Sequence, residues 1–212
     1  MVENLGPEVV WKYFPDPTEV IKTQVQKLSS LYQTYNAHVN VISRRDIDQI
    51  YLHHVLHSLS LLKLLHQSSS RKVLDLGTGG GFPGIPLAIY SPDCHFTLID
   101  GSRKKIRIVQ QVIESLGLSN VEAHHMRAED FQGSFDHIVC RAVASTKQLI
   151  SWTRNLTTPN TRMDLLKGGD LVEELAFLSR NQCEVLSISD QFDETYFQSK
   201  KIVRIRFSDG SR

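Results

Sequence analysis

The sequence is poor in cysteine, in net charge and in long apolar runs. Its three cysteines, Cys94, Cys140 and Cys183, lie far apart and form no CxxC pair, so a disulfide framework is excluded and we expect reduced thiols. No apolar stretch approaches the length that spans a membrane, and the first residues, MVENLGPEVVWKYF, contain neither a basic leader nor an apolar core segment. These absences predict a cytoplasmic protein with no membrane partner.

The net charge of +1 excludes a protein coated in positive charge, but it leaves room for local basic clusters. Two clusters are present: Arg103, Lys104, Lys105 and Arg107, and Lys200, Lys201, Arg204 and Arg206. Taken singly, they are better explained as a solvated helix face and as an edge strand guarded by lysines. Together with an enzyme core, they would favour a polyanionic substrate.

The 212 residues, 41% hydrophobic and 22% charged, are typical of a soluble globular protein and are enough for a full core. From Pro17 to Leu65 the apolar residues recur at intervals of three and four, which predicts helices. A polar joint, Gln67 to Ser70, follows, and strands then alternate with helices. We therefore expect an N-terminal helical region at 1–70 and a second domain at 71–212.

The most informative segment is Val73–Pro86, VLDLGTGGGFPGIP, a strand that leads into a glycine cluster and then a helix. Gly77, Gly79 and Gly81 allow positive φ and leave no Cβ between the main chain and a ligand. The start of the following helix offers unpaired N–H groups. This segment predicts an enzyme that binds a nucleotide-like cofactor.

The glycine spacing distinguishes between cofactors. A dinucleotide-binding fold reads GxGxxG and needs its third glycine for helix packing, but Phe82 occupies that position. The pattern is instead DxGxGxG, headed by Asp75, and it resembles the first motif of class I S-adenosylmethionine-dependent methyltransferases. Asp100 follows Gly77 by 23 residues and ends a second strand, where a carboxylate can accept both hydroxyls of a ribose. Either adenosine cofactor would use that acid, so Asp100 does not discriminate.

The second domain is predicted to be α/β. Strands are expected at 71–76, 95–100, 120–126, 135–140, 161–166, 183–189 and 201–207, and helices at 84–90, 103–117, 145–156 and 170–180. This alternation predicts a mostly parallel, Rossmann-like sheet of about seven strands, with its ligand outside the carboxyl ends of the strands. The last two strands lack an adequate helix between them, so they should pair as a hairpin. The seventh strand would then be antiparallel, as in class I methyltransferases.

The tract YNAHVNVISRRDIDQIYLHHVLHSL resembles the helical lead-in of the GidB/RsmG family, bacterial methyltransferases that modify a guanine at nitrogen-7 in small-subunit (16S) ribosomal RNA. The segments LDLGTGGGFPGIPLAI, FTLIDGSRKKIRIVQQV, FDHIVCRAVAS and LLKG are similar to that family's successive motifs, in the same order. The resemblance covers about Leu28 to Lys167. It implies S-adenosyl-L-methionine as cofactor and 16S ribosomal RNA, or a precursor of the small subunit, as partner.

The resemblance also implies a cofactor site. Gly77 and Phe82 match the family's glycine and apolar contacts, and Gly79 and Gly81 lie in the same loop. Asp100 matches the acid at the end of the second strand. Asp75 is a secondary candidate that we expect to orient the loop rather than to touch the ligand.

Further candidates follow the third and fourth strands. Ala128 and Glu129, within HMRAEDF, match the pair that flanks the adenine, and Arg127 aligns with a basic position of the family. Arg141, in CRAVAS, matches an arginine beside the methionine end of the cofactor and the catalytic face. Its side chain would hold the cofactor carboxylate, or grip the guanine oxygen and a phosphate, and this choice stays open.

The family commonly has arginine then histidine, and later an aspartate, where this chain has His53, His54 and His57. The role of the helix that carries these histidines is therefore open. No acid or cysteine completes a zinc set around them, so we expect no metal, and helix packing or a phosphate contact is the better interpretation.

Guanine nitrogen-7 carries a lone pair and no proton, so in-line attack on a sulfonium methyl group needs positioning and electrostatics rather than a base. Methylation of an exocyclic amine would favour an Asn/Asp-Pro-Pro-aromatic motif after the fourth strand, where this chain has Cys140-Arg141-Ala142-Val143. Methylation of cytosine at carbon-5 needs a cysteine nucleophile. No proline precedes Cys140, and we interpret it as a buried strand-end residue.

Two other functions are compatible with the residues: a non-catalytic RNA-binding or ribosome-assembly protein that keeps the fold, and a small-molecule methyltransferase. We expect a monomer. The residues alone do not fix the target nucleotide, nor whether free RNA or an assembling subunit is the substrate.

Overall fold

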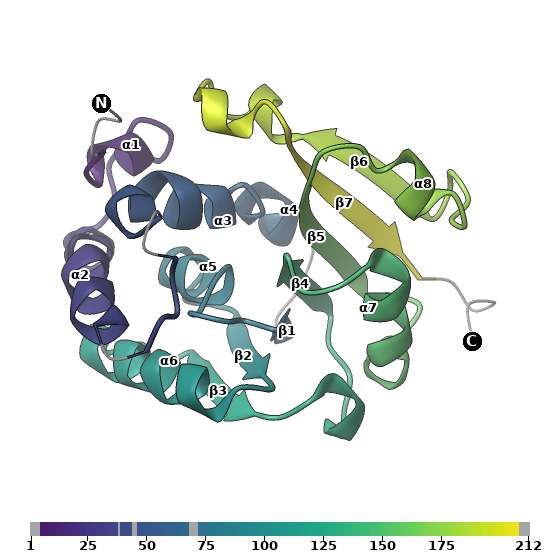
Figure 1. Cartoon of the computed structure of the whole chain (residues 1–212), viewed down its shortest axis with the longest axis horizontal. Coiled ribbons are helices and arrows are strands. Elements are labelled where there is room, and N and C mark those ends of the chain that lie inside the picture. Colours follow the sequence, from purple (N-terminus) through teal and green to yellow (C-terminus); the bar gives the residue numbers. More distant parts are fainter. Residues whose placement is uncertain (1–4, 38, 44–45, 68–71, 208–212) are drawn as a thin grey trace.

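The computed structural model describes residues 5–37, 39–43, 46–67 and 72–207. Its centre is a seven-stranded sheet in the order β3-β2-β1-β4-β5-β7-β6 (Figure 1). The strands are β1 Lys72–Leu76, β2 His95–Asp100, β3 Val121–His125, β4 His137–Arg141, β5 Arg162–Gly168, β6 Cys183–Ser187 and β7 Lys200–Arg206. The first five strands pair in parallel, and β7 is antiparallel to both β5 and β6. The predicted fold class and the antiparallel seventh strand are confirmed.

The strand order reverses between β1 and β4, which lie side by side at the middle of the sheet. At such a point the connections that leave the two strands run to opposite faces, and a crevice opens beyond their carboxyl ends. The glycine loop follows β1, and the CRAVAS tract follows β4. The topology therefore brings the two most distinctive motifs of the sequence together.

Helices cover both faces of the sheet. They are α1 Glu8–Trp11, α2 Glu19–Asn36, α3 His57–Leu59, α4 Leu62–His66, α5 Gly84–Tyr90, α6 Arg103–Leu116, α7 Thr146–Trp152 and α8 Val172–Leu175. A π-helical segment, Ile50–Leu56, precedes α3, and short 3-10 turns span Ile47–Gln49, Ala128–Asp130, Arg154–Leu156, Ile188–Asp190 and Thr195–Phe197. Helices α5, α6 and α7 lie where the sequence predicted helices, at 84–90, 103–117 and 145–156.

The prediction of a helix at 170–180 is wrong, because only the four residues of α8 are helical there. None of these four residues is buried, and Val172 is 76% exposed. A short helix in water depends on tertiary packing of an apolar face, and of the apolar residues of α8 only Leu175 packs, in part, against the core.

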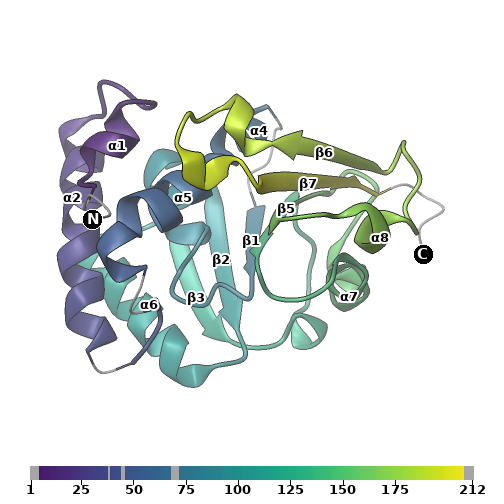
Figure 2. The ribbon, with the colours of Figure 1, turned by 45° about the horizontal axis from the view of Figure 1, so that its top comes forward.

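The apolar core has two parts, one on each face of the sheet. One contains α2, α5, α6 and the helical residues before β1, and the other lies beneath α7 and around β4 and β5. Figures 1 and 2 show α2 beside α5 and α6. The residues before β1 thus share one core with the sheet. The predicted boundary between residues 70 and 71 lies outside the described residues, and the division into two parts stays a prediction.

Strand β7 is not the edge strand that its lysines and arginines predicted, because β6 covers its outer side. One of its cations, Arg204, pairs with a buried carboxylate. Arg204 Nε donates to Asp164 Oδ1 over 3.1 Å, and His137 Nε2 lies 2.8 Å from the other oxygen of the same carboxylate. Burial alone would raise the pKa of Asp164, but the hydrogen bond from His137 and the charge of Arg204 hold the pKa below its ordinary value.

The N-terminal helices also reach the glycine loop. The hydroxyl of Tyr32, on α2, donates a hydrogen bond to the carbonyl oxygen of Gly80, and the Tyr32 side chain is fully buried. Its ring packs against that of Phe82, with ring centroids 5.0 Å apart. A helix that is distant in sequence therefore supports the loop from behind.

We expect Tyr32→Phe to lower the free energy of unfolding by about 1–3 kcal/mol, because the change leaves the buried Gly80 carbonyl without its donor. Urea unfolding of the variant and the wild type measures the loss. Tyr35→Phe is the matched control, since Tyr35 lies on the same helix and its hydroxyl makes only a 3.3 Å contact near the surface. Equal losses in the two variants would contradict the supporting role of Tyr32.

Candidate functional site

The glycine loop leaves β1 with positive φ at Gly77 (68°), Gly79 (58°) and Gly81 (94°), which explains its composition. Asp75 holds the loop closed. Its Oδ2 accepts a hydrogen bond from Thr78 Oγ1 over 2.6 Å and another from the Gly84 amide over 2.8 Å. Asp75 is fully buried and lines none of the hollows described below, so the structure agrees with an orienting role.

Asp100, at the end of β2, faces the same loop. Its Oδ2 accepts from the Gly79 amide over 2.9 Å, and its Oδ1 accepts from the Ser102 amide over 2.8 Å. Each carboxylate oxygen keeps a second lone pair. The carboxylate is thus fixed in orientation and can still accept further hydrogen bonds.

A hollow of about 290 Å³, here called the glycine hollow, opens between these elements. It is lined by Leu76, Gly77, Ile99, Asp100, Gly101, Met126, Arg127, Ala128, Glu129, Val143 and Trp152. Four of the predicted cofactor residues therefore meet in one place, although they come from three separate connections. Arg127 joins them, and apolar side chains line the hollow next to a fixed carboxylate.

The other predicted residues lie beside the glycine hollow rather than in its lining. Gly79 does not line the glycine hollow, but its amide donates a hydrogen bond to Asp100, which does. At Gly81 a Cβ atom would lie 2.5 Å from a side-chain atom of Ile85, so this glycine serves close packing. Phe82 is 2% exposed and is packed against Tyr32 and His54.

Arg141 opens onto a second hollow of about 360 Å³, here called the histidine hollow. It is lined by Asp46, His53, His54, His57, Arg141, Ala142, Leu166, Lys167, Gly168, Tyr196 and Lys200. Arg141 donates from Nη1 to the carbonyl oxygen of His53 over 3.1 Å, and its Nη2 lies 2.7 Å from His54 Nδ1. The structure thus places the histidine tract and the CRAVAS tract against each other.

The buried histidines of this hollow are neutral. Burial and the positive charge of Arg141 lower the pKa of His54 well below its ordinary value, and the same causes lower the pKa of His57 to about 3. The ring of His53 is stacked on Tyr196 at a centroid distance of 4.0 Å, and its Nδ1 lies 2.8 Å from Asp46 Oδ1. Within the described parts of the chain, no group of three or more His, Cys, Asp or Glu side chains is placed to hold a metal ion.

Residues 141–143 separate the two hollows. Arg141 and Ala142 line the histidine hollow, and Val143 lines the glycine hollow. A Cβ atom at Gly77 would lie 2.5 Å from Val143 Cγ2, so the two motifs are in direct contact. The two hollows therefore lie next to each other, with residues 141–143 at their boundary.

Among the residues that line the histidine hollow, the sequence predicted no site role for Asp46, Lys167, Lys200 or Tyr196. Lys167 lies in the LLKG tract, which is similar to a motif of the family, but no function was assigned to this lysine. Lys200 was noted only as one member of a basic cluster. Tyr196, in the connection between β6 and β7, belongs to no motif, and only the fold brings it beside His53.

Cys140 is 1% exposed, and burial raises the pKa of its thiol to about 12. The thiol is therefore protonated and shielded, which confirms the interpretation of Cys140 as a buried strand-end residue and leaves it unsuited to act as a nucleophile.

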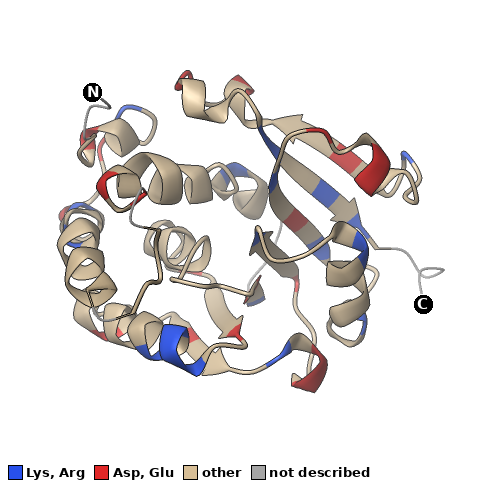
Figure 3. Ribbon diagram, in the orientation of Figure 1, with Lys and Arg blue, Asp and Glu red and all other residues tan. Residues whose placement is uncertain are grey.

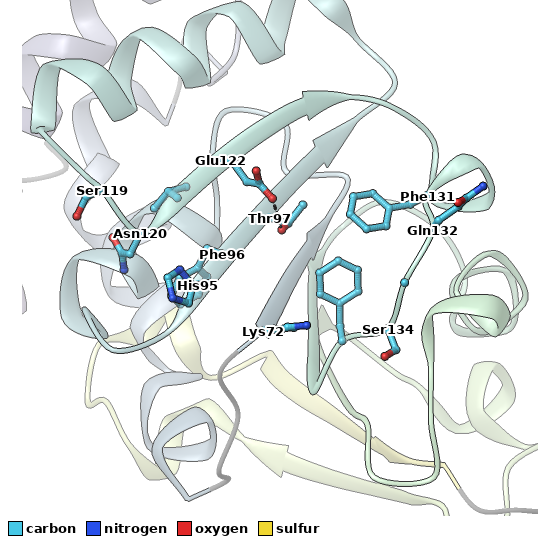
Figure 4. Close-up of a pocket in the computed structure, with 13 residues that line it drawn as sticks. Lys72, His95, Phe96, Thr97, Ser119, Asn120, Glu122, Phe131, Gln132 and Ser134 are labelled. Atoms are coloured by element: carbon cyan, nitrogen blue, oxygen red, sulfur yellow. Dashed lines mark hydrogen bonds between the residues drawn. The ribbon is translucent and has the colours of Figure 1, made fainter.

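A larger hollow of about 450 Å³ lies at the other end of the strands, around the amino ends of β1, β2 and β3 (Figure 4). Its lining includes Lys72, His95, Thr97, Glu122 and Phe131, and Thr97 Oγ1 donates to Glu122 Oε1 over 3.0 Å. None of the predicted site residues lines it. In an open α/β sheet the ligand binds outside the carboxyl ends of the strands, which favours the other two hollows.

Comparison with known proteins gives one family. A family model described as rRNA small subunit methyltransferase G matches residues 21–203. The ribosomal RNA small subunit methyltransferase G of Flavobacterium psychrophilum is 46% identical over 204 residues, which are 93% of this chain and 97% of that protein. The protein of the same description from Bacteroides thetaiotaomicron is 43% identical over 202 residues, 92% of this chain and 98% of that protein.

Solved structures of methyltransferases share the fold. The O-methyltransferase TomG from Streptomyces achromogenes, solved in complex with S-adenosylmethionine, matches with a TM-score of 0.57 and 16% identity over 98% of this chain and 100% of that chain. A putative O-methyltransferase from Klebsiella pneumoniae matches with a TM-score of 0.59 and 11% identity over 95% and 96% of the two chains. At these identities the likeness concerns the fold alone.

The Asp75 carboxyl gives a pH dependence that can be tested. Burial raises its pKa from 3.8 to about 7, so the folded protein holds a proton there that the unfolded chain releases. The contribution of this group to stability is therefore present below its unfolded pKa and is lost as the pH rises toward 7. Relative to the wild type, Asp75→Asn should gain stability from about pH 4 to about pH 7 and change little above.

Denaturant unfolding of both proteins at several pH values measures this difference. The exposed Asp48→Asn variant is the control. A difference between Asp75→Asn and the wild type that does not change with pH would contradict the raised pKa.

Proposed function

The chain belongs to the rRNA small subunit methyltransferase G family, and from this we propose that it transfers a methyl group from S-adenosylmethionine to nitrogen-7 of a guanine in small-subunit (16S) ribosomal RNA. The observation that carries the proposal is the pair of adjacent hollows beyond the carboxyl ends of β1 and β4. One holds the residues predicted for a methyl donor, and the other offers polar groups to a methyl acceptor. For the transfer, the methyl group and the acceptor would have to meet at the boundary between the two hollows, beside residues 141–143.

The glycine hollow fits S-adenosylmethionine. Gly77 has no side chain, and a Cβ atom there would collide with Val143. Asp100 keeps free lone pairs for the hydroxyls of a ribose, while Ile99, Met126 and Ala128 provide apolar surface for an adenine. We assign the cofactor contacts to Gly77, Asp100, Ala128 and Glu129, with Gly79, Gly81 and Phe82 as the support of the loop.

When bound, the cofactor supplies a methyl group on a positively charged sulfur atom. The protein's part is to hold the acceptor in line with that methyl group and to exclude water. Guanine nitrogen-7 needs no proton removed, and the site matches this requirement, because the lowered pKa values of His54 and His57 make them weak bases and Cys140 is shielded. We assign Arg141 to the catalytic face, where it contacts the acceptor.

A polyanionic substrate is supported by the basic cluster at the start of α6. Figure 3 shows it as a blue patch, and it consists of Arg103, Lys104, Lys105 and Arg107. Among the described residues, no carboxylate forms an ion pair with any of these cations. The cluster directly follows Asp100 and Gly101, which line the glycine hollow. Phosphates of an RNA strand are the groups that such a cluster binds.

We further propose that the protein acts as a monomer in the cytoplasm, where small subunits are assembled, and that residues 1–70 help to engage the RNA. None of the described helices is long and apolar enough to cross a membrane. A non-catalytic role is less well supported, because that role would not require the predicted cofactor residues to converge on one hollow.

We expect Asp100→Asn to raise the Kd for S-adenosylmethionine by about tenfold to a hundredfold, because it removes the charge that strengthens the hydrogen bonds of the ribose. Isothermal titration calorimetry measures the change. Asp130→Asn is the matched control, since its exposed carboxylate follows Glu129 directly and lines none of the described hollows. Wild-type protein that does not bind S-adenosylmethionine would refute the proposed function.

We also expect loss of one methylated guanine from the small-subunit RNA of cells that lack this gene. Mapping of 7-methylguanine by reverse-transcription stops, after chemical cleavage at the modified base, locates the position. Restoration of the gene should restore the stop. An unchanged pattern would reject the assignment to guanine nitrogen-7.

A further inference from the structure

Arg141 is a partly buried cation whose hydrogen-bond acceptors are both uncharged. They are the carbonyl oxygen of His53 and the Nδ1 atom of His54, and the guanidinium carbon lies 5.3 Å from the centre of the Phe82 ring. Among the described residues, no carboxylate forms an ion pair with Arg141. The acidic residue of the histidine hollow, Asp46, is instead bonded to Ser43 and His53. The charge of Arg141 is therefore available to a ligand.

The hydrogen bond to His54 fixes the tautomer of that ring. A guanidinium group can only donate, so His54 Nδ1 must accept. The neutral ring then carries its proton on Nε2, and within the described residues this atom is buried and has no partner. A carboxylate in place of His54 would also hold Arg141, but it would cancel the positive charge. A neutral imidazole positions the guanidinium and leaves the charge intact.

Both acceptors come from the π-helical segment Ile50–Leu56. This winding is rare and occurs frequently at functional sites. Here it presents a main-chain carbonyl and the next residue's ring to the same guanidinium. Two of the five N–H groups of Arg141 are used in this way, and its planar fork is held at the edge of a hollow that also contains Lys200 and Tyr196.

We propose that the histidine hollow receives the target guanine, and that His54 is a positioning residue that aims Arg141 at the guanine O6 atom. The inference rests on the proposed function and deepens it. The edge of guanine that carries nitrogen-7 presents two acceptors, N7 and O6, whereas adenine presents an amino group in place of O6. Arg141 offers only donors. A donor aimed at O6 accepts guanine, rejects adenine and leaves nitrogen-7 free to attack the methyl group.

The first experiment compares His54→Leu with His54→Asn. Leucine has no acceptor for Arg141, whereas the side-chain oxygen of asparagine lies near the position of Nδ1 and can restore the bond. We expect His54→Leu to lower kcat for methylation of small-subunit RNA by about tenfold to a hundredfold, and His54→Asn to recover most of the loss. The Kd for S-adenosylmethionine should stay within about twofold in both variants, because His54 does not line the glycine hollow.

His66→Leu is the matched control, since this exposed histidine lies on α4 and lines neither of the two hollows. Equal activity of His54→Leu and the wild type would overturn the inference. Equal losses in His54→Leu and His54→Asn would also overturn it, because a purely structural role predicts no rescue. Long-range proton–nitrogen NMR spectra check the tautomer independently, and a proton on Nδ1 of His54 would contradict the geometry.

The second experiment changes the RNA and does not depend on the folding of any variant. The guanine located by reverse-transcription stops is replaced by 2-aminopurine, which keeps N7 and lacks O6. We expect kcat/KM of the wild type to fall by about tenfold or more on this RNA, after correction for the reactivity of each N7 atom toward dimethyl sulfate. His54→Leu should show a much smaller further loss, because the contact is already missing.

The outcomes separate the two proposals. Wild-type protein that binds S-adenosylmethionine and methylates both RNAs equally well would overturn the role of O6 and leave the proposed function intact. Wild-type protein that methylates neither RNA would refute the proposed function and, with it, this inference. A fall on 2-aminopurine that is as large in His54→Leu as in the wild type would show that O6 is read by another residue, and would overturn the role of His54.

Discussion

The hydrogen bonds that hold the glycine loop determine the geometry of the whole site. Asp75 fixes the loop from the β1 side, Asp100 fixes it from the end of β2, and Tyr32 supports it from α2. Each bond joins the loop to a different structural element. Because the hydroxyl of Tyr32 comes from α2, the helices before β1 support the glycine loop as well as covering the sheet.

The fold was largely predictable from local patterns. Strand β2 and helix α5 have the predicted bounds, because β-branched runs and glycine breaks mark them clearly. The convergence of Gly77, Asp100 and Glu129 was also predictable, since each follows a strand of one parallel sheet. By contrast, α8 was overestimated, because its composition permits a helix while its packing does not support one.

The histidine hollow was beyond the reach of sequence patterns. The bond between His54 and Arg141 joins residues 87 positions apart, and no spacing rule encodes it. Tyr196 comes from a connection without a motif, and the π-helical winding that carries His53 and His54 has no signature in the apolar periodicity. The roles of these residues depend on tertiary contacts, in which a charge, a carbonyl and a ring meet only after the chain has folded.

The boundary between the two hollows contains a residue with a strained backbone conformation. Ala142 has a φ of +51°, in the left-handed region, where an L-residue with a Cβ atom is disfavoured by about 1–2 kcal/mol. The contacts on both sides must hold this residue in place. The rest of the fold therefore offsets this cost at the residue that joins Arg141, in the histidine hollow, to Val143, in the glycine hollow.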